Sequence, residues 1–542
     1  MKKKSWLMLL FIFVLAVGTV LAGCAKDDPK SAGSDTESGK EATGESEGNA
    51  EDIQTPVITL DWFVAEEWFQ RNWDPDNNLM DKKMLEDIGV ELNFTSGSLE
   101  KLSAMIASGD IPDLVTLNNQ AAQRGVLERS GYVIPLDELL PEHAPEMVVP
   151  QSIQDWFRAE DGHYYGLPNY FYAPEDMTDK HFYPTHNTMR VRQDLMNQLG
   201  IEASAFDTKE GTIEALRKVK DAKLEYDGFE IVPAYFFYDN LIQFFGADRE
   251  DEQGNYVDMF REPESLEVYK FLNQLYTERL LPEDSLTLTE AQVQEKVNAG
   301  SVFAYTNWRI KWNGLFKSDE EAVFVPAGPI KGDEGNPFHF KPSSLGGWTI
   351  TMVGKKTEHE ARVAKLLEYL SQDQMSLESL FGPKGIGWDY DDGHVKFTEQ
   401  YLQDYAKDPT AADMKYKGVE WLVNWLDVQP AFPLPTNENE RLESVTEAHF
   451  SQYSFNTLPF EAVTPTGGME EAAINTKIEE YRESMGAKMV LAKSEEEVEQ
   501  LFNSMPSQEE KLGYDKLYEH WNTQFKITKQ KLGMDFAWPE NQ

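Results

Sequence analysis

Hydrophobic and polar positions between residues 57 and 117 change their period repeatedly, which predicts alternating strands and helices. Short β-branched or alternating runs predict strands at 57–60, 90–94 and 114–117. Between them, apolar residues recur every three or four positions, which predicts helices near 80–88 and 99–106, ended by Gly89 and Gly109. This order and spacing are typical of a doubly wound α/β sheet with right-handed crossovers.

A second set of such units follows from about residue 188. We expect helices at 191–199, 212–219, 266–276 and 292–299, and a strand at 302–305. A further strand at 349–353 precedes a helix at 363–370, and the last third of the chain is mostly helical. Two α/β lobes with additional C-terminal helices therefore account for the 542 residues without an internal repeat.

The first 54 residues are predicted to anchor the chain rather than to fold. Residues 1–23 combine a lysine-rich start, an apolar run and small residues before Cys24, which predicts a lipoprotein signal peptide. Cys24 is the only cysteine, so an intramolecular disulfide and a multi-cysteine metal site are excluded. We expect Cys24 to carry the lipid, palmitate included, and residues 24–54 to form a flexible tether on the outer, extracytoplasmic face of the cell membrane.

The charge and the motifs narrow the function classes. The formal net charge of −44 excludes a nucleic-acid partner, because its field repels phosphates, and it favours a neutral or cationic ligand. The chain has no Gly-x-Ser-x-Gly elbow, no His-Glu-x-x-His pair and no Walker loop. The sequence therefore predicts no catalytic residues and favours a binding protein over an enzyme.

Five stretches carry a resemblance to a known family, and they occur in the family's order. They are 107–114, 131–137, 161–168, 192–200 and 381–388. Together they resemble family 1 extracellular solute-binding proteins, in particular the large lipoprotein branch of Gram-positive bacteria. The resemblance implies a two-lobed, periplasmic-binding-protein-like α/β fold (type II) with a hinge. Residues 55–186 with 340–430 would form lobe one, and 187–339 with 431–542 lobe two.

The same resemblance implies a function. The chain would capture a carbohydrate, an oligosaccharide in our expectation, between its lobes and deliver it to the permease subunits of an ABC importer in the membrane. We expect a monomer without a cofactor. Some relatives hold structural calcium in an EF-hand-like loop, but 221–228 lacks alternating carboxylates. The stretch from Asp74 begins like such a loop, yet Leu79 stands where the turn glycine is needed.

Candidate ligand-binding residues follow the carboxyl ends of the predicted strands, where open α/β sheets bind ligands. Aromatic rings stack on the C–H face of a sugar, whereas amide, carboxylate and guanidinium groups bond its hydroxyls. The strand ends supply Asp61, Trp62, Phe63, Asn118, Asn119, Trp308 and Arg309. Asn169 and Tyr170 follow Gly166-Leu167-Pro168 near the expected first crossing between the lobes, and Trp348 and Trp388 lie in glycine-rich loops. Asp239 closes an aromatic run, 235–239, that fits either a buried strand or a subsite wall.

Two alternatives remain open at this point. An extracellular carbohydrate-active hydrolase needs only two carboxylates, and acidic residues are abundant. A peptide- or signal-binding protein of the same fold would also use aromatic rings and carboxylates. No acidic pair stands out from the solvated helix faces, so the sequence favours carbohydrate capture over both alternatives.

Overall fold

The computed structural model describes residues 56–178, 182–307, 309–343, 345–419, 422–424, 428–465 and 469–542. The predicted signal peptide at 1–23, the tether at 24–54 with Cys24, and Trp308 lie outside the described residues. Within the described ranges, no helix combines the length and the apolar character needed to cross a bilayer.

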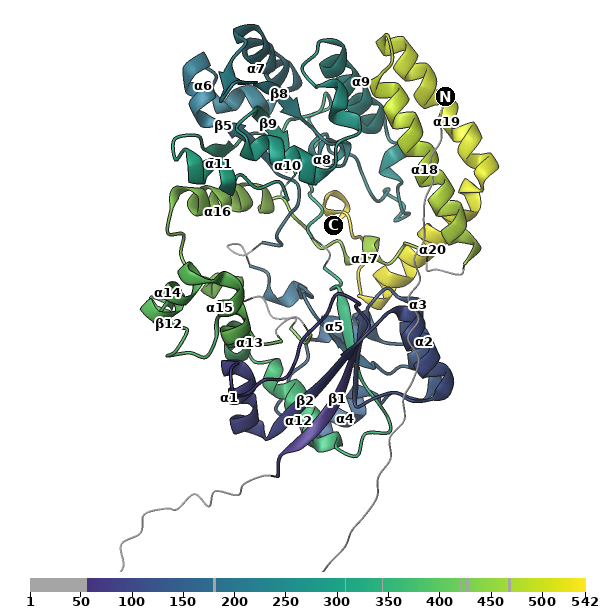
Figure 1. The fold of residues 1–542 in the computed structure, drawn as a ribbon. Coiled ribbons are helices and arrows are strands. Elements are labelled where there is room, and N and C mark those ends of the chain that lie inside the picture. Colours follow the sequence, from purple (N-terminus) through teal and green to yellow (C-terminus); the bar gives the residue numbers. More distant parts are fainter. Residues whose placement is uncertain are drawn as a thin grey trace, which may run out of the picture. The chain divides into compact units, whose positions relative to one another are not determined.

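A five-stranded sheet in the order β2-β1-β3-β11-β4 forms the centre of the first lobe (Figure 1). Its strands are β1 (Ile58–Val64), β2 (Val90–Ser96), β3 (Leu114–Asn118), β4 (Gly166–Pro168) and β11 (Thr349–Val353). β1 runs parallel to β2 and to β3, with crossovers through α1 (Leu79–Ile88) and α2 (Leu99–Ser108), as the sequence predicts. β11 is antiparallel to β3 and β4, so the sheet is mixed rather than wholly parallel.

Helix boundaries in this lobe follow local chemistry. The side chain of Asn78 caps α1 by accepting from the amides of Met80 and Asp81, and α1 ends at Gly89 in the left-handed conformation. The remaining elements of the first lobe are α3 (Ala122–Ser130), α4 (Leu136–His143), α5 (Gln151–Phe157), α12 (Glu360–Leu370), α13 (Asp373–Phe381), α14 (Glu399–Lys407), α15 (Pro409–Tyr416) and the hairpin β12 (Trp388–Asp391) with β13 (His394–Phe397).

The second lobe has a four-stranded sheet in the order β10-β5-β9-β8. Its strands are β5 (Met189–Arg192), β8 (Val232–Tyr235), β9 (Val302–Thr306) and β10 (Phe324–Pro326). The helix predicted at 191–199 begins too early, because Met189–Arg192 pairs with strands on both sides and only α6 (Gln193–Leu199) is helical. Met189 and Val191 alternate with two arginines, which is the period of a strand, so Val191 does not belong to the helical pattern.

Helices surround this second sheet and complete the C-terminal third, as Figure 1 shows. Around the sheet lie α7 (Lys209–Ala222), α8 (Tyr238–Phe244), α9 (Pro263–Thr277), α10 (Glu290–Asn298), α11 (Asn313–Ser318), α16 (Glu438–Ser451) and the hairpin β6 (Glu225–Tyr226) with β7 (Phe229–Glu230). The chain ends with α17 (Leu458–Glu461), α18 (Glu470–Val490), α19 (Glu495–Leu512) and α20 (Tyr514–Lys531). α18 and α19 pack on α9, whereas α20 contacts α17.

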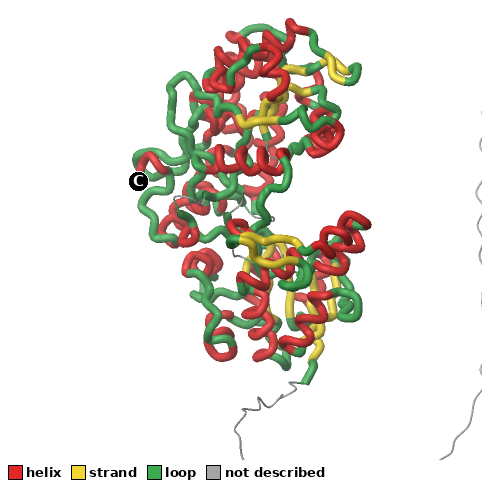
Figure 2. Tube along the Cα trace, turned by 90° about the vertical axis from the view of Figure 1, so that its left-hand side faces the viewer, coloured by secondary structure: helices red, strands yellow, loops and turns green. Residues whose placement is uncertain are grey.

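Short 3-10 turns connect several of these elements. They are Pro174–Asp176, Ala203–Asp207, Met259–Arg261, Glu283–Leu286, Gln429–Ala431 and Pro539–Asn541. Figure 2 shows the strands in two separate groups with helices and loops around each.

Two large hydrophobic cores correspond to the two sheets. One contains side chains from 60–183 and 345–423 together with Leu458, and the other contains side chains from 189–340 and 450–505. The chain therefore passes between the cores more than once. The lobe bounds given above remain predictions, because the cores record which side chains pack together and not where a lobe ends.

Candidate ligand-binding cleft

The aromatic cavity, of about 520 Å³, has walls from both lobes. Tyr170, Tyr172 and Trp348 line it from the first-lobe side, and Arg190 and Lys311 line it from the second sheet and the loop after β9. Rings on one side and charged groups on the other make a cavity that can hold an amphipathic solute such as a sugar.

Trp348 forms an aromatic platform with a second tryptophan. The rings of Trp68 and Trp348 are stacked, with centroids 5.9 Å apart and an interplanar angle of 13°. Trp348 remains 36% exposed and Trp68 58% exposed, so ring surface of both stays in contact with solvent. Trp68 Nε1 donates to Glu66 Oε2 over 2.8 Å, which orients the ring. Exposed, oriented indoles are surfaces on which a sugar ring can stack.

The loop that carries Trp348 is held by two buried asparagines. Asn169 Oδ1 accepts from the backbone amides of Trp348, at 3.2 Å, and Thr349, at 2.6 Å. Asn119 Nδ2 donates to the carbonyl oxygens of Gly346, at 2.7 Å, and Gly347, at 2.9 Å. Gly347 adopts φ +79°, and a Cβ atom there would collide with the carbonyl oxygen of Asn169. The loop is therefore fixed by side chains from two other segments.

Tyr170 lies beside this loop in an unusual backbone conformation. Its φ is 49°, a left-handed value that costs a residue other than glycine about 1 kcal/mol. Its amide donates to the carbonyl of Asn424, and its side chain is 41% exposed at the cavity. Strain of this kind persists where the surrounding structure enforces it, and it is enriched at ligand sites.

Glu443 of α16 is held by three donors on the opposite wall. Arg190 Nη2 lies 2.8 Å from Glu443 Oε2, and Lys311 Nζ lies 2.6 Å from the same oxygen. Trp312 Nε1 donates to Glu443 Oε1 over 2.9 Å. Two cations and one indole therefore surround one carboxylate on this wall.

The charged cavity, of about 770 Å³, adjoins the aromatic cavity and shares His186 with it. Asp239 at the start of α8 and Arg309 after β9 line it. Burial, and then the charges of Arg309, Lys341 and Lys311, lower the pKa of His186 from 6.5 to about 4. His186 is therefore neutral at neutral pH.

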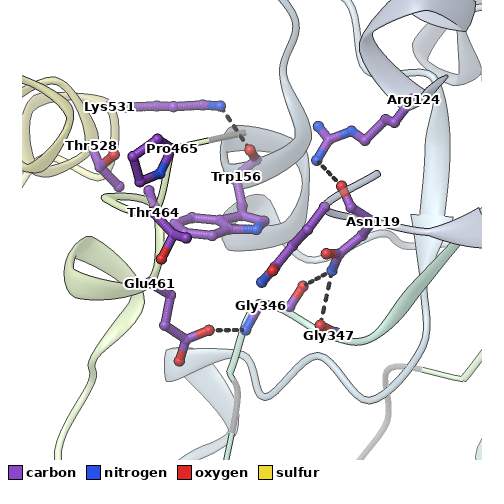
Figure 3. Close-up of a pocket in the computed structure, with 12 residues that line it drawn as sticks. Asn119, Arg124, Trp156, Gly346, Gly347, Glu461, Thr464, Pro465, Thr528 and Lys531 are labelled. Carbon is purple, nitrogen blue, oxygen red and sulfur yellow. Dashed lines mark hydrogen bonds between the residues drawn. The ribbon is translucent and has the colours of Figure 1, made fainter. Parts of the chain in front are cut away.

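A third cavity, of about 310 Å³, is lined by Trp156 of α5 and by residues of α20 and is drawn in Figure 3. Lys531 Nζ donates to the carbonyl oxygens of Trp156, at 2.7 Å, and Arg158, at 3.0 Å. Glu461 accepts from the amides of Leu345 and Gly346. Burial, followed by the charge of Arg124, lowers the pKa of Lys531 to about 8. These bonds tie the C-terminal helices to the first lobe.

Basic residues line all three cavities, although the whole chain holds 94 acidic and 50 basic residues. They are Arg124 and Lys531 in the third cavity, Arg190 and Lys311 in the aromatic cavity, and Arg249, Arg309, Lys341 and Arg482 in the charged cavity. The formal net charge of −44 is therefore a poor guide to the charge inside the cleft.

Comparison by sequence and comparison by structure both find solute-binding proteins. No family model matches the chain. The polygalacturonan/rhamnogalacturonan-binding protein YtcQ of Bacillus subtilis (strain 168) is 20% identical over 537 residues, which cover 92% of this chain and 99% of that protein. An extracellular solute-binding protein from Bifidobacterium longum subsp. infantis superposes with a TM-score of 0.65 at 14% identity, covering 88% of this chain and 99% of its own.

The S. pneumoniae ABC-transporter substrate-binding protein FusA, solved with kestose, superposes with a TM-score of 0.61 at 16% identity and covers 87% of this chain and 100% of its own. The chain has the two-lobed fold of ABC-transporter solute-binding proteins. The predicted fold class is confirmed, and these relatives are binding proteins rather than enzymes.

Within this solute-binding fold, several predicted site residues come together. Asn119, Asn169, Tyr170 and Trp348 converge around one loop, the two asparagines as its supports and the two aromatic residues on the cavity wall. Asp239 and Arg309 line the charged cavity. Asn118 lines a separate, open surface pocket together with Trp68. Its side chain accepts from the amide of Gln120. Trp308 lies outside the described residues.

The structure does not bring the remaining four predicted residues to the cavities. The strand predicted to end at Leu60 continues to Val64, so Asp61, Trp62 and Phe63 lie inside β1. Trp62 and Phe63 are fully buried, and Trp62 Nε1 donates to Thr116 Oγ1 over 2.8 Å. Asp61 bonds Asn93 of the neighbouring strand. Trp388 is also fully buried, with Nε1 on the carbonyl of Gly382.

Sequence reasoning missed several residues of the cleft. With the true end of β1 at Val64, the rule that ligands bind after strand ends selects Trp68 instead of Trp62. The run 235–239 is part buried strand and part cavity wall. Tyr235 ends a buried strand, whereas Phe237, Tyr238 and Asp239 line the charged cavity. No sequence signal identified the other missed residues, which are His186, Arg190, Lys311, Glu443 and Phe432.

The described ranges contain no group of three or more His, Cys, Asp or Glu residues arranged to hold a metal ion. In the loop that begins at Asp74, the carboxylate of Asp74 accepts from both the backbone amide and the side-chain amide of Asn77. That carboxylate is occupied by local hydrogen bonds.

Proposed function

We propose that this chain is an extracytoplasmic solute-binding protein that captures an oligosaccharide in the cleft between its lobes for delivery to an ABC importer. The observation that carries the proposal is the solvent-exposed indole of Trp348, which stacks on Trp68 and lines a cavity whose opposite side is polar. Covering about 60 Å² of apolar sugar face at roughly 25 cal/mol/Å² stabilises the complex by about 1.5 kcal/mol per platform.

The names of similar proteins support a sugar as the ligand. YtcQ is named for binding polygalacturonan and rhamnogalacturonan, and FusA was solved with kestose. Both proteins match nearly their whole length to this chain. A carbohydrate fits the cleft physically, because its C–H faces suit the indole rings while its hydroxyls suit the amide and charged groups around them.

Capture would work by closing the lobes around the ligand. The sugar stacks on the first lobe, recruits groups such as Arg190 and Lys311 from the second, and thereby stabilises the closed form. The permease of the importer would recognise that form. A lipid on Cys24 and the tether at 24–54 would keep the binding protein close to the permease at high effective concentration.

A hydrolase is less consistent with the chemistry of the walls. A glycosidase needs one carboxyl group that stays protonated beside a second that is ionised. Glu443, which lines the aromatic cavity, accepts from Arg190, Lys311 and Trp312. Its oxygens are therefore engaged by partners within the protein rather than free to contact a glycosidic oxygen.

Calorimetric titration of the chain with kestose and with trigalacturonate tests the proposal. At least one of these sugars should bind with a dissociation constant near the micromolar range and be recovered intact. Trp348→Ala should weaken that binding about ten-fold, because one stacking face is lost. The matched control is Phe229→Ala, an exposed aromatic on the β6–β7 hairpin that lines none of the three cavities.

Three outcomes would contradict the proposal. Release of shorter sugars would favour the hydrolase, and a response to peptides alone would favour a peptide-binding protein. Equal sugar affinity of Trp348→Ala and the unmodified chain would remove the aromatic cavity as the binding site.

A further inference from the structure

The charged cavity contains an arginine that is almost completely buried without an acidic partner. Arg249 lies in the loop after α8 and is only 9% exposed. Its Nε and Nη1 atoms have no hydrogen-bond acceptor in the part of the chain that the structure describes. The guanidinium lies over the ring of Phe460, 4.4 Å from the centroid, and interacts with Tyr256. A buried cation is costly unless it is paired, so this arrangement indicates an anion that the protein itself does not supply.

Lys341 places a second positive charge at the same cavity. Burial, followed by the charge of Arg249, lowers the pKa of the Lys341 amine, whereas the charges of Glu461 and Asp239 act in the opposite direction. Among the described residues, no carboxylate lies within ion-pair distance of either Lys341 or Arg249. The two cations therefore repel each other, and an anion bound between them would relieve that repulsion.

The other two arginines of the wall are already paired. Arg482 Nη2 lies 2.6 Å from Asp258 Oδ2, and its Nε lies 2.6 Å from Glu509 Oε1. Arg309 Nη1 lies 3.8 Å from Glu290 Oε2. Arg249 and Lys341 thus differ from their basic neighbours, because the latter have partners within the protein and are not available to an anion.

Acidic groups also face this cavity and set a limit on its charge. Asp239 and Glu479 line it, and so do Asp258 and Glu290, the partners of Arg482 and Arg309. Burial raises the pKa of Asp239, and the charge of Lys341 opposes that rise. The cavity is therefore mixed in charge, and the pair Arg249 and Lys341 is the part of its wall that is suited to a carboxylate.

We propose that Arg249 and Lys341 form an acidic-sugar subsite, which takes the carboxylate of a uronate unit while the rest of the oligosaccharide lies in the aromatic cavity. This inference rests on the proposed function, since the two cavities adjoin at His186. A guanidinium presents donors in a planar fork that matches the two oxygens of a carboxylate, and an ammonium adds a point charge. A neutral sugar would leave both cations unpaired.

The test compares trigalacturonate with its fully methyl-esterified form, which keeps the rings and removes the charge. Calorimetry with the whole chain should give about ten-fold tighter binding of the acid, because its carboxylate can form charge-assisted hydrogen bonds that the ester cannot. In Arg249→Gln this preference should fall to about two-fold. Lys341→Gln provides a second variant, in which the preference should fall to about three-fold because one of the two cations is lost.

Arg129→Gln serves as the control, because Arg129 is an exposed arginine on α3 that lines none of the three cavities. It should keep the full preference for the acid. Equal binding of acid and ester by the unmodified chain would overturn the acidic-sugar subsite and leave the proposed function intact. An acid preference that survives in both Arg249→Gln and Lys341→Gln would also overturn it. Failure of acid, ester and kestose alike to bind would instead contradict the proposed function.

Discussion

The aromatic cavity and the charged cavity share His186 but differ in how they could hold a ligand. In the aromatic cavity the cations are neutralised by Glu443, and exposed indole rings supply the contact surface. In the charged cavity Arg249 and Lys341 keep unpaired charge. Stacking on rings tolerates many sugars, whereas a buried cation selects for a carboxylate. The difference teaches that affinity and selectivity can reside in neighbouring parts of one cleft.

Removal of Asn169, which supports the loop that carries Trp348, should destabilise the folded chain. Asn169→Ala leaves the buried amide of Thr349 without an acceptor, whereas the amide of Trp348 keeps the backbone carbonyl of Asn169 at 3.3 Å. At roughly 1–3 kcal/mol for an unsatisfied buried group, the free energy of unfolding should fall by up to about 3 kcal/mol. Urea denaturation measures this. Asn118→Ala, which removes only a half-buried bond to the Gln120 amide, should cost less than about 1 kcal/mol. Similar losses in both variants would contradict the special role of Asn169.

The shared residue His186 should make stability depend on pH. Its pKa in the folded chain is lowered from 6.5 to about 4, so between these values the unfolded chain binds a proton that the folded chain does not. The free energy of unfolding should therefore fall as the pH drops through this window, by up to about 3 kcal/mol. His186→Gln should lack this part of the pH dependence. Parallel curves for the two chains in urea titrations between pH 6.5 and about 4 would show that His186 is not buried as described.

The stacked pair Trp68 and Trp348 should contribute jointly to sugar binding. Trp68→Ala should weaken sugar binding about five-fold, because an aromatic pair contributes roughly 0.5–1.5 kcal/mol and orients its partner. The double variant with Trp348→Ala should be less than additive, since stacked side chains act together. Calorimetry of the four chains gives the coupling, and strict additivity would mean that the two rings act independently.

Salt should weaken binding of the acidic ligand more than binding of its ester, and this is the smallest of the expected effects. Raising sodium chloride from about 0.05 M to about 0.5 M should weaken binding of trigalacturonate roughly three-fold, because screening reduces the attraction of Arg249 and Lys341 for the carboxylate. Binding of the methyl ester should change little. An equal response of both ligands in calorimetry would indicate that charge does not distinguish the cavities.

Much of the fold could be predicted from the sequence, because it rests on local patterns. The period of the apolar residues placed β1, β2 and β3, their crossover helices and β11. The same patterns did not give the end of β1, because the strand continues through three consecutive buried residues, Trp62, Phe63 and Val64, which break the alternation of apolar and polar positions. Because the predicted strand ended four residues too early, the expected aromatic platform was Trp62 instead of Trp68.

The site could be predicted only where a strand end or a glycine-rich loop marked it. Trp348 and Tyr170 lie beside Gly347 and Pro168, and these markers led to them. Arg190, Lys311 and Glu443 are brought together by long-range packing between β5, the loop after β9 and α16, which leaves no local signal. Arg249 was invisible for a similar reason, because its significance lies in the partner it lacks.

The most direct test is a crystal structure of the chain with trigalacturonate. The account predicts an intact sugar between the lobes, with one ring stacked on the indole of Trp348 and contacts to the second-lobe wall at Arg190 or Lys311. Absence of sugar density from the aromatic cavity, or a cleaved glycosidic bond in the bound sugar, would contradict the claim that this cleft captures an oligosaccharide without altering it.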